Sequence, residues 1–265
     1  MKYVFGFLGT GNMGSALVRA VCKTVDSNKI CICDQNKDKT NSLKTELGLN
    51  VENAENLVKN SEFLVLGVKP QMLESVTGEL ADAMQDNASL KIISMLAAVD
   101  TQKLASCFGD REYIRIMPNT PVNLGEGAVL YCVRNASQST EKTFTTAFEK
   151  AGKVVKIEEN LMDGGMSLSG CGPAFVYMFI DALKQAGEKL GLDSELALTL
   201  ATQTVKGSAM MVEKFGNPEQ LKINVCSPGG TTIEGVKSLE NDDLYKAVEN
   251  ALNASYEKSK ILAKK

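Results

Sequence analysis

The sequence predicts an α/β chain in which a doubly wound, mostly parallel sheet is followed by an all-α C-terminal domain. Continuous apolar runs of strand length alternate with helical patterns in the first part of the 265-residue chain, as parallel sheets with helices on both faces require. After about Glu159 the strand patterns stop and helical patterns follow. We therefore expect one domain at residues 1–159 and a second at residues 160–265.

The expected elements of the first domain follow in chain order from these patterns. Strands are expected at residues 3–8, 29–33, 63–68, 91–96, 113–117, 127–133 and 154–157. Helices are expected between them at residues 15–25, 37–47, 71–84, 101–108 and 140–151.

The second domain is expected to contain three long helices, at residues 173–190, 194–214 and 242–263. In the middle helix Ala197, Ala201, Val205 and Ala209 recur every four residues. Three helices in roughly 100 residues make a thin independent core. We therefore expect them to be buried against a second copy of the chain, with packing on the sheet domain as the alternative.

Composition indicates a globular protein with reduced thiols in the cytoplasm. The net charge is −3, which predicts no general attraction to nucleic acid or to an anionic membrane. The N-terminal apolar segment is too short for a signal peptide, and the apolar run at residues 174–180 stops at Asp181, so no transmembrane helix is expected. Seven scattered cysteines without a C-x-x-C pair predict reduced thiols and no metal site.

Histidine is absent from the chain. This excludes nucleophile systems that depend on a Ser-His or Cys-His pair, and it disfavours a hydroxy-acid dehydrogenase that uses imidazole as its base. The reaction must therefore need little from a base near neutral pH.

A Gly-rich turn after the first strand predicts a Rossmann-type dinucleotide site. Gly9-Thr10-Gly11-Asn12-Met13-Gly14 follows a strand and opens a helix, which is the context that the G-x-G-x-x-G pattern needs. Gly9 would permit the tight turn, Gly11 the approach of the pyrophosphate, and Gly14 the close packing of helix on strand. Asp34, at the end of the second strand, could accept hydrogen bonds from the ribose hydroxyls.

The choice between NADPH and NADH stays open at this stage. Asp34 would repel a 2′-phosphate, whereas Lys37 and Lys39 could bind one or could be solvated surface lysines. Val68-Lys69-Pro70 follows a strand at the carboxyl edge of the sheet, where ligands bind, and we assign it to the cofactor site. Pro70 fits a first helical residue, and Lys69 could equally be a solvated loop charge.

The run Ser227-Pro228-Gly229-Gly230-Thr231-Thr232 predicts a carboxylate cradle. Two adjacent glycines let successive N–H groups turn toward one point, and a following helix would add its positive end. The alternative is a loop between helices with an N-cap threonine.

Together these motifs resemble those of the pyrroline-5-carboxylate reductases, over almost the whole length. The Gly9–Gly14 turn is shared by many dehydrogenases, whereas the 227–232 run is highly specific to this family. The chain departs from the family at Cys171, where Ser is usual. The other matching motifs are Val68-Lys69-Pro70, Arg-Ile-Met-Pro-Asn-Thr-Pro at 115–121, Leu-Ser-Gly-Cys-Gly-Pro-Ala at 168–174, Gln-Thr-Val-Lys-Gly at 203–207 and Leu239-Glu240.

The resemblance implies a C-terminal domain that interlocks with a partner chain, an active site between the two domains, and dimers that often assemble further into decamers. It implies NADPH or NADH as cofactor and pyrroline-5-carboxylate and L-proline as substrate and product. The substrate carboxylate would bind at Ser227, Gly229, Gly230 and Thr231, and Thr232 would hydrogen-bond the ring nitrogen.

Two further groups of residues complete the expected site. Asn119 and Thr120 follow a strand end and could touch the nicotinamide, a turn-forming Asn being the alternative. Ser169, Gly170 and Gly172 would shape the substrate pocket. A protonated cyclic imine accepts hydride readily, so it needs placement more than a strong acid or base, which fits a chain without histidine.

Two other functions are open from the sequence. One is a β-hydroxyacid dehydrogenase, with Lys184, Lys189 or Lys206 as the acid; the other is a non-catalytic dinucleotide sensor. Neither explains the 227–232 run.

Overall fold

The computed structural model describes residues 2–263. The chain divides into two compact units, Met1–Cys171 together with Tyr256–Lys265, and Gly172–Ser255. The sequence-based division after residue 159 marks where strands give way to helices. The division by contacts lies further along the chain, because the short helices that follow the last strand still pack on the sheet.

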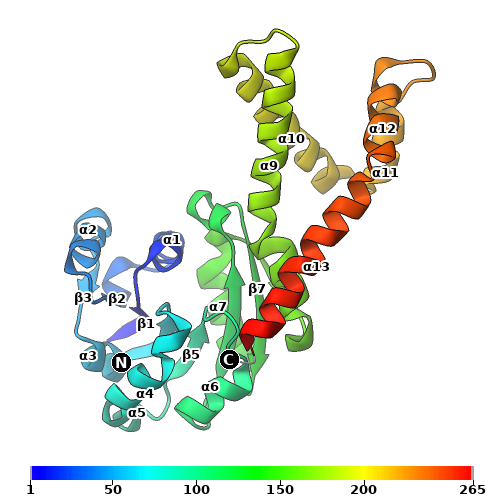
Figure 1. Cartoon of the computed structure of the whole chain (residues 1–265). Helices are drawn as coiled ribbons and strands as arrows, with labels where there is room; N and C mark the ends of the chain where they lie inside the picture. The colour runs from blue at the N-terminus through cyan, green and yellow to red at the C-terminus, as the bar shows by residue number, and fades with distance from the viewer. Residues whose placement is uncertain (1, 264–265) are drawn as a thin grey trace. The chain divides into compact units, whose positions relative to one another are not determined.

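An eight-stranded sheet forms the centre of the first unit (Figure 1). The strand order is β3-β2-β1-β4-β5-β6-β7-β8, and every pairing is parallel except that of β6 with β7. This confirms the predicted doubly wound, mostly parallel sheet. The strands are β1 (Tyr3–Leu8), β2 (Ile30–Cys33), β3 (Asn50–Val51), β4 (Ser61–Leu66), β5 (Lys91–Ser94), β6 (Tyr113–Pro118), β7 (Gly127–Arg134) and β8 (Gly152–Lys156).

Helices cover both faces of this sheet, because the central strands are apolar on both sides. One core cluster joins the sheet to α1, α2 and α7, and the other joins it to α3, α4, α5 and α6. The helices are α1 (Asn12–Val21), α2 (Lys37–Leu47), α3 (Ala54–Asn60), α4 (Leu73–Glu79), α5 (Ala81–Asp86), α6 (Thr101–Phe108) and α7 (Gln138–Phe148).

The structure corrects the predicted elements in three places. Strand β3 and helix α3 were not predicted. The helix expected at residues 71–84 is broken into the 3-10 helix η2 (Pro70–Met72), α4 and α5, with a break in helical geometry at Leu80. Helix α1 begins at Asn12 instead of residue 15, because Gly11 already occupies the N-cap position.

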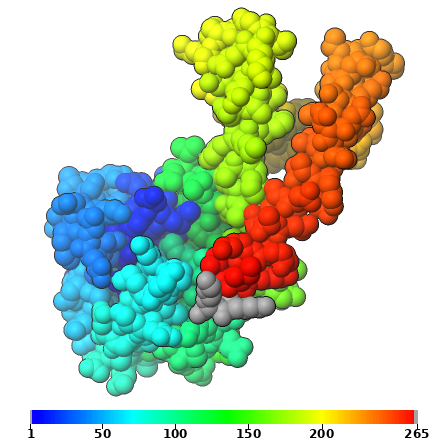
Figure 2. All heavy atoms as spheres, in the orientation of Figure 1, coloured from blue at the N-terminus to red at the C-terminus, as the bar shows by residue number. Residues whose placement is uncertain are grey.

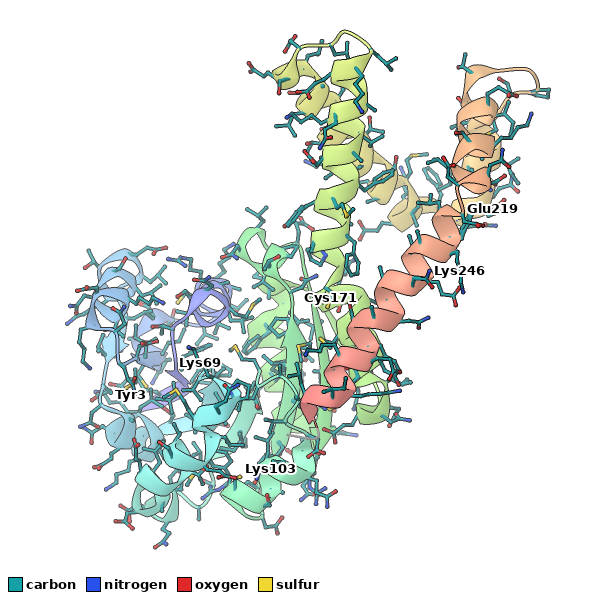
Figure 3. All side chains as sticks on the ribbon, viewed as in Figure 1. Tyr3, Lys69, Lys103, Cys171, Glu219 and Lys246 are labelled. Atoms are coloured by element: carbon teal, nitrogen blue, oxygen red, sulfur yellow. The ribbon has the colours of Figure 1, made fainter. Side chains whose placement is uncertain are left out.

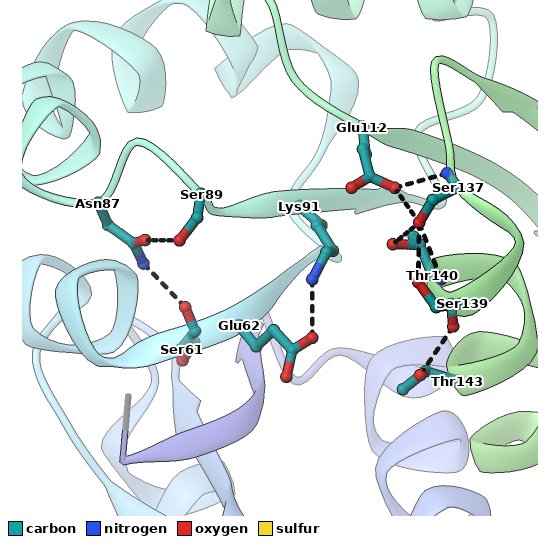
Figure 4. Close-up of polar contacts among 10 residues, drawn as sticks. All are labelled: Ser61, Glu62, Asn87, Ser89, Lys91, Glu112, Ser137, Ser139, Thr140 and Thr143. Carbon is teal, nitrogen blue, oxygen red and sulfur yellow. Dashed lines mark hydrogen bonds and ion pairs between the residues drawn. The ribbon is translucent and has the colours of Figure 1, made fainter.

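Polar side chains at the amino ends of the parallel strands stabilise that edge of the sheet (Figure 4). Lys91 pairs with Glu62 at 2.7 Å, and Glu112 accepts from the Ser137 N–H at 2.7 Å at the start of α7. An open hollow of about 690 Å³ lies beside them. The Arg111 guanidinium that lines it donates to five backbone carbonyls, so the structural role of this side chain explains its position.

The turn after β5 contains a strained residue. Ala98 has φ +61°, and the Val99 N–H donates to the Leu96 carbonyl at 3.4 Å, so Ala98 takes the turn position that glycine usually occupies. We expect Ala98→Gly to raise the free energy of unfolding by about 1 kcal/mol, because it relieves left-handed strain that costs more than glycine's added chain entropy. Thermal unfolding measures this, and Ala97→Gly in the same turn is the matched control. A lower melting temperature for Ala98→Gly than for wild type would contradict the assignment.

The second unit consists of helices that bury few apolar side chains among themselves. Its elements are α9 (Gly172–Lys189), α10 (Ser194–Phe215), α11 (Pro218–Val225), α12 (Thr231–Asn241) and the first part of α13 (Leu244–Ala263). Helix α11 was not predicted. Among its described residues, the buried apolar side chains are Ala197 and Ala201, where α10 packs on α9.

Large apolar side chains of the second unit are instead exposed, and Figure 2 shows its helices with much of their surface uncovered. Met178 is 77% exposed and Tyr177 is 60% exposed on α9, and α10 exposes Met210 and Met211. A unit of this kind lacks an independent core, as the sequence predicted, and it needs a partner surface.

Within residues 2–263, one helical stretch, Glu159–Lys189, is long and apolar enough to cross a membrane by length and composition alone. This differs from the expectation based on residues 174–180, because the stretch also takes in the short helices before α9. The core helix of a soluble protein meets the same criterion.

Candidate functional site

Three glycines let the ends of β1, β4 and α1 meet closely. Gly9 has φ +100°, and its N–H donates to the Cys33 carbonyl at 2.8 Å. A Cβ on Gly14 would lie 2.3 Å from the Gly9 carbonyl oxygen, and one on Gly67 would lie 2.7 Å from the same atom. The predicted backbone roles of Gly9 and Gly14 are therefore present in the structure. Gly67 was missed, because it belongs to no recognised pattern.

The N-terminus of α1 is open to a ligand. Gly11 is its N-cap, no described side chain caps the helix, and its first turn contains no acidic residue. A Cβ built on Gly11 would meet no described atom within 4 Å. Unpaired N–H groups and the positive end of the helix dipole therefore face free space, which suits a pyrophosphate.

Asp34 anchors this Gly-rich turn. Its Oδ2 accepts from the Thr10 N–H at 2.6 Å and the Thr10 hydroxyl at 3.1 Å, and its Oδ1 accepts from the Asn36 N–H at 2.8 Å. Burial by itself raises the pKa of Asp34, but these hydrogen bonds outweigh it and hold the pKa below its usual value. A carboxylate offers about four acceptor positions, so room remains for a ribose hydroxyl.

A cavity of about 430 Å³ lies at the carboxyl ends of β1, β2 and β4. Lys69, labelled in Figure 3, and Lys37 bring positive charge to it beside Asp34. Its size and position suit part of a dinucleotide. Its full lining is Leu8, Gly9, Gly11, Cys33, Asp34, Gln35, Lys37, Asn53, Ala54, Gly67, Val68, Lys69, Met72, Val76, Glu79 and Leu80.

Most residues predicted to bind the cofactor lie in or beside this cavity. Gly9, Gly11, Asp34, Val68 and Lys69 line it. Thr10 is fully buried, and Pro70 is the first residue of η2. The other predicted residues lie in the adjoining turns and helix starts, and they are Thr10, Asn12, Met13, Gly14 and Pro70.

Asn119 and Thr120 follow β6 at the start of the 3-10 helix η3 (Thr120–Leu124). Asn119 is committed to protein contacts: Oδ1 accepts from the Ala128 N–H at 2.8 Å, and Nδ2 donates to the Ser169 carbonyl at 2.9 Å. Ser169 belongs to the π-helix η6 (Met166–Gly170), which ends just before α9, where Figure 3 labels Cys171. The structure therefore brings Asn119 to the predicted pocket segment at Ser169 and Gly170, with Gly172 at the start of α9.

In the second unit, Ser227-Pro228-Gly229-Gly230 forms a tight turn. The Gly230 N–H donates to the Ser227 carbonyl at 3.0 Å, and Gly229 has φ +71°, which with Pro228 before it is typical of a type II turn. A Cβ on Gly230 would lie 2.5 Å from the Ser227 Oγ. The turn therefore requires Gly229, and a Cβ on Gly230 would force the Ser227 hydroxyl to move.

The turn leads directly into α12, which has a free N-terminus. Gly230 is the N-cap, and no described side chain caps the helix. This corrects the alternative in which a threonine caps α12, because Thr231 and Thr232 are the first two helical residues. Both are exposed, so the N–H groups of the first turn and the Thr232 hydroxyl are accessible to a carboxylate-bearing ligand.

The fold, the Gly-rich turn and the cavity define a dinucleotide-binding oxidoreductase. Two family models agree: the NADP oxidoreductase coenzyme F420-dependent model matches residues 4–98, and the pyrroline-5-carboxylate reductase dimerisation model matches residues 159–262. Pyrroline-5-carboxylate reductase of Arabidopsis thaliana is 36% identical over 267 residues, which span 99% of this chain and 96% of the plant protein. The chain belongs to the pyrroline-5-carboxylate reductase family.

Solved structures of the family agree over the whole chain. The Plasmodium falciparum pyrroline carboxylate reductase with NADP bound has a TM-score of 0.87 at 34% identity and covers 98% of both chains. The pyrroline-5-carboxylate reductase of Coxiella burnetii has a TM-score of 0.91 at 30% identity and covers 99% of both chains. The exposed apolar helices of the second unit thus belong to a dimerisation domain.

Proposed function

We propose that this protein reduces pyrroline-5-carboxylate to L-proline with NADPH or NADH. The observation that carries the proposal is the Ser227–Thr232 turn with the open α12 N-terminus, in a chain of this family that also has a dinucleotide site. A dinucleotide sensor or a hydroxy-acid dehydrogenase would not need the turn. Lys184, a candidate acid for the latter, is paired with Glu188 at 3.4 Å.

The first unit would hold the cofactor. The N–H groups at the start of α1 and the open space beside Gly11 suit the pyrophosphate, and Asp34 suits a ribose hydroxyl. Lys37 is the residue of this cavity best suited to a 2′-phosphate, should NADPH be preferred. The reduced nicotinamide supplies the hydride, and Asn119 and Thr120 follow a strand at the same carboxyl edge of the sheet.

The second unit would hold the substrate carboxylate on the N–H groups of Thr231 and the residues after it, because the Gly230 N–H already donates to the Ser227 carbonyl. Ser227, through its hydroxyl, and Gly229, through its backbone, would complete the cradle. Ser169, Gly170 and Gly172 would shape the ring pocket. The Thr232 hydroxyl would orient the ring nitrogen and donate to the lone pair that develops on it as the hydride is transferred.

The reaction needs little acid–base chemistry from the protein. A protonated cyclic imine is already electrophilic, so binding and orientation provide the main rate gain. A threonine hydroxyl is a poor acid, and we assign Thr232 hydrogen bonding to the developing amine instead of full proton delivery. A chain without histidine suits such a reaction.

The proposal also covers the oligomeric state of the enzyme and its location in the cell. The exposed side chains of α9 and α10 support a dimer in which a second copy covers them, and further assembly into a decamer is consistent with the family resemblance. We place the enzyme in the cytoplasm, where reduced cysteines are stable; all seven are free in the structure.

The test is oxidation of NADPH and of NADH, followed separately by absorbance after addition of pyrroline-5-carboxylate to the purified protein. We expect rapid substrate-dependent loss of at least one reduced cofactor. Binding of both cofactors without oxidation of either would reject the reductase and favour the sensor.

Asp34 provides a separate test of the cofactor site. We expect Asp34→Ser to raise the ratio of kcat/KM for NADPH to that for NADH about tenfold, because it removes a negative charge that repels a 2′-phosphate. Loss of the hydrogen bonds to Thr10 should weaken the binding of both cofactors alike. The ratio of the two kcat/KM values therefore reports the effect of the negative charge alone. Asp38→Ser, exposed on α2, is the control. An unchanged ratio would show that Asp34 does not face the ribose.

A further inference from the structure

Asn119 stands at the N-cap of η3, but its side chain does not cap that helix. Asparagine at an N-cap usually accepts from N–H groups of its own helix. Asn119 is the N-cap of η3, but among the described residues its side chain makes no such bond. It reaches across to β7 through Ala128 and to η6 through the Ser169 carbonyl.

The Ser169 carbonyl accepts a hydrogen bond from a donor outside its own helix. In an α-helix this carbonyl would accept from the N–H four residues ahead, but that residue is Pro173, which has none. The local backbone is a π-helix, with the Cys171 N–H donating to the Met166 carbonyl at 3.1 Å. Single π-turns inside helices occur often at functional sites. The Asn119 amide supplies the donor that Pro173 lacks.

The segment between β8 and α9 is thus attached to the sheet at two points. Near its start, Glu159 accepts from the Thr101 N–H at 2.8 Å and the Thr101 hydroxyl at 2.5 Å, and it pairs with buried Arg115 at 3.4 Å. At its end, Asn119 holds Ser169. Arg115 lies in β6 and Asn119 directly follows β6, so this strand and the turn after it contact both ends of the segment.

We propose that Asn119 is a positioning residue that sets substrate affinity by holding the π-helix at Ser169 and Gly170 in its binding geometry. The inference rests on the proposed function, in which these two residues shape the imine pocket. Asn119 acts here through the Ser169 backbone and contributes no group to the reacting atoms.

Asn119→Asp tests this with little change in shape. It keeps an acceptor for the Ala128 N–H, removes the donor to Ser169, and places a negative charge near the Ser169 carbonyl. We expect KM for pyrroline-5-carboxylate to rise about tenfold, with kcat and KM for the cofactor within about threefold of wild type. Asn123→Asp is the matched control, because exposed Asn123 donates to a backbone carbonyl in the same turn, that of Thr120 at 3.0 Å.

A second readout does not depend on activity. Hydrogen exchange of the amides at residues 166–172 should be faster in Asn119→Asp than in Asn123→Asp, while exchange in β1 and β4 stays unchanged. Asn119→Ala, which removes the donor without adding charge, should show the same two effects and replaces Asn119→Asp if that variant does not fold.

The outcomes separate the inference from the proposed function. Faster exchange without a change in substrate KM would overturn the positioning role, as would an equal rise in KM for substrate and cofactor. If wild type reduces no cyclic imine, the proposed function fails, and with it the role in affinity. Unchanged exchange in both Asn119 variants would show that the contact with Ser169 does not hold the π-helix.

Discussion

Replacing Thr232 by alanine is expected to lower kcat for imine reduction about 100-fold, the loss typical of removing one hydrogen-bond donor from a reacting centre. The helix should tolerate the change, because Thr232 is exposed at the second position of α12 and alanine favours helix more than threonine does. Steady-state kinetics with saturating cofactor measure the effect. Cofactor affinity and melting temperature should stay as in wild type.

Thr231→Ala is the matched control for this experiment. Thr231 is its exposed neighbour in α12, and the account uses only its backbone N–H, which alanine retains. We expect kcat for Thr231→Ala within about threefold of wild type, since no transition-state contact is lost. Equal losses in both variants would point to the helix start as a whole, and unchanged turnover in Thr232→Ala would remove Thr232 from the mechanism.

Replacing Gly14 by alanine is expected to abolish measurable cofactor binding and to destabilise the first unit by about 2 kcal/mol, because overpacking against rigid backbone forces a shift. The added Cβ would lie 2.3 Å from the Gly9 carbonyl oxygen, so the turn must move away from α1. Fluorescence titration of the reduced cofactor and thermal unfolding measure the two effects.

Substitutions at two other glycines separate the loss of cofactor binding from the loss of stability. Gly11→Ala adds a Cβ where no described atom lies within 4 Å, so we expect normal stability but weaker cofactor binding, since the Cβ fills space meant for the pyrophosphate. Gly78→Ala, on the exposed side of α4, should weaken neither cofactor binding nor the stability of the fold. If Gly11→Ala binds both cofactors like wild type, the pyrophosphate does not lie there.

Local signals explain why parts of this fold could be predicted from the sequence. The bounds of α2 and α6 were predicted correctly, because Asn36 and Asp100 cap their first turns and glycines follow their ends. The Gly-rich turn is likewise encoded within a few residues. The thin helical core was also foreseen, since composition and helix count already fall short of what an independent domain needs.

The elements that were missed are too short to carry a periodic pattern. Strand β3 has two residues and α3 has seven, so neither gives a clear apolar repeat. Two residues that line the cofactor cavity were missed for that reason: Asn53, between these two elements, and Ala54, the first residue of α3. Asn53 is a local signal that could have located the start of α3, since it is a favoured N-cap residue and its side chain accepts from the Asn56 N–H at 2.8 Å.

Contacts between distant segments were beyond the reach of sequence patterns. Asn119 and Ser169 are 50 positions apart, and their motifs predicted a separate role for each without linking them. Asp34 was expected to bind ribose, but its anchoring of Thr10 depends on how β1 and β2 are paired. Side-chain-to-backbone bonds between distant segments appear only once the fold is known.

Formation of L-proline tests the central claim most directly. The purified protein would be incubated with pyrroline-5-carboxylate and a limiting amount of the reduced cofactor that it oxidises faster, and the product quantified by chiral chromatography. One L-proline should form for each cofactor oxidised, and its formation should be about 100-fold slower with Thr232→Ala. Cofactor binding with no proline formed, or oxidation that does not depend on the imine, would contradict it.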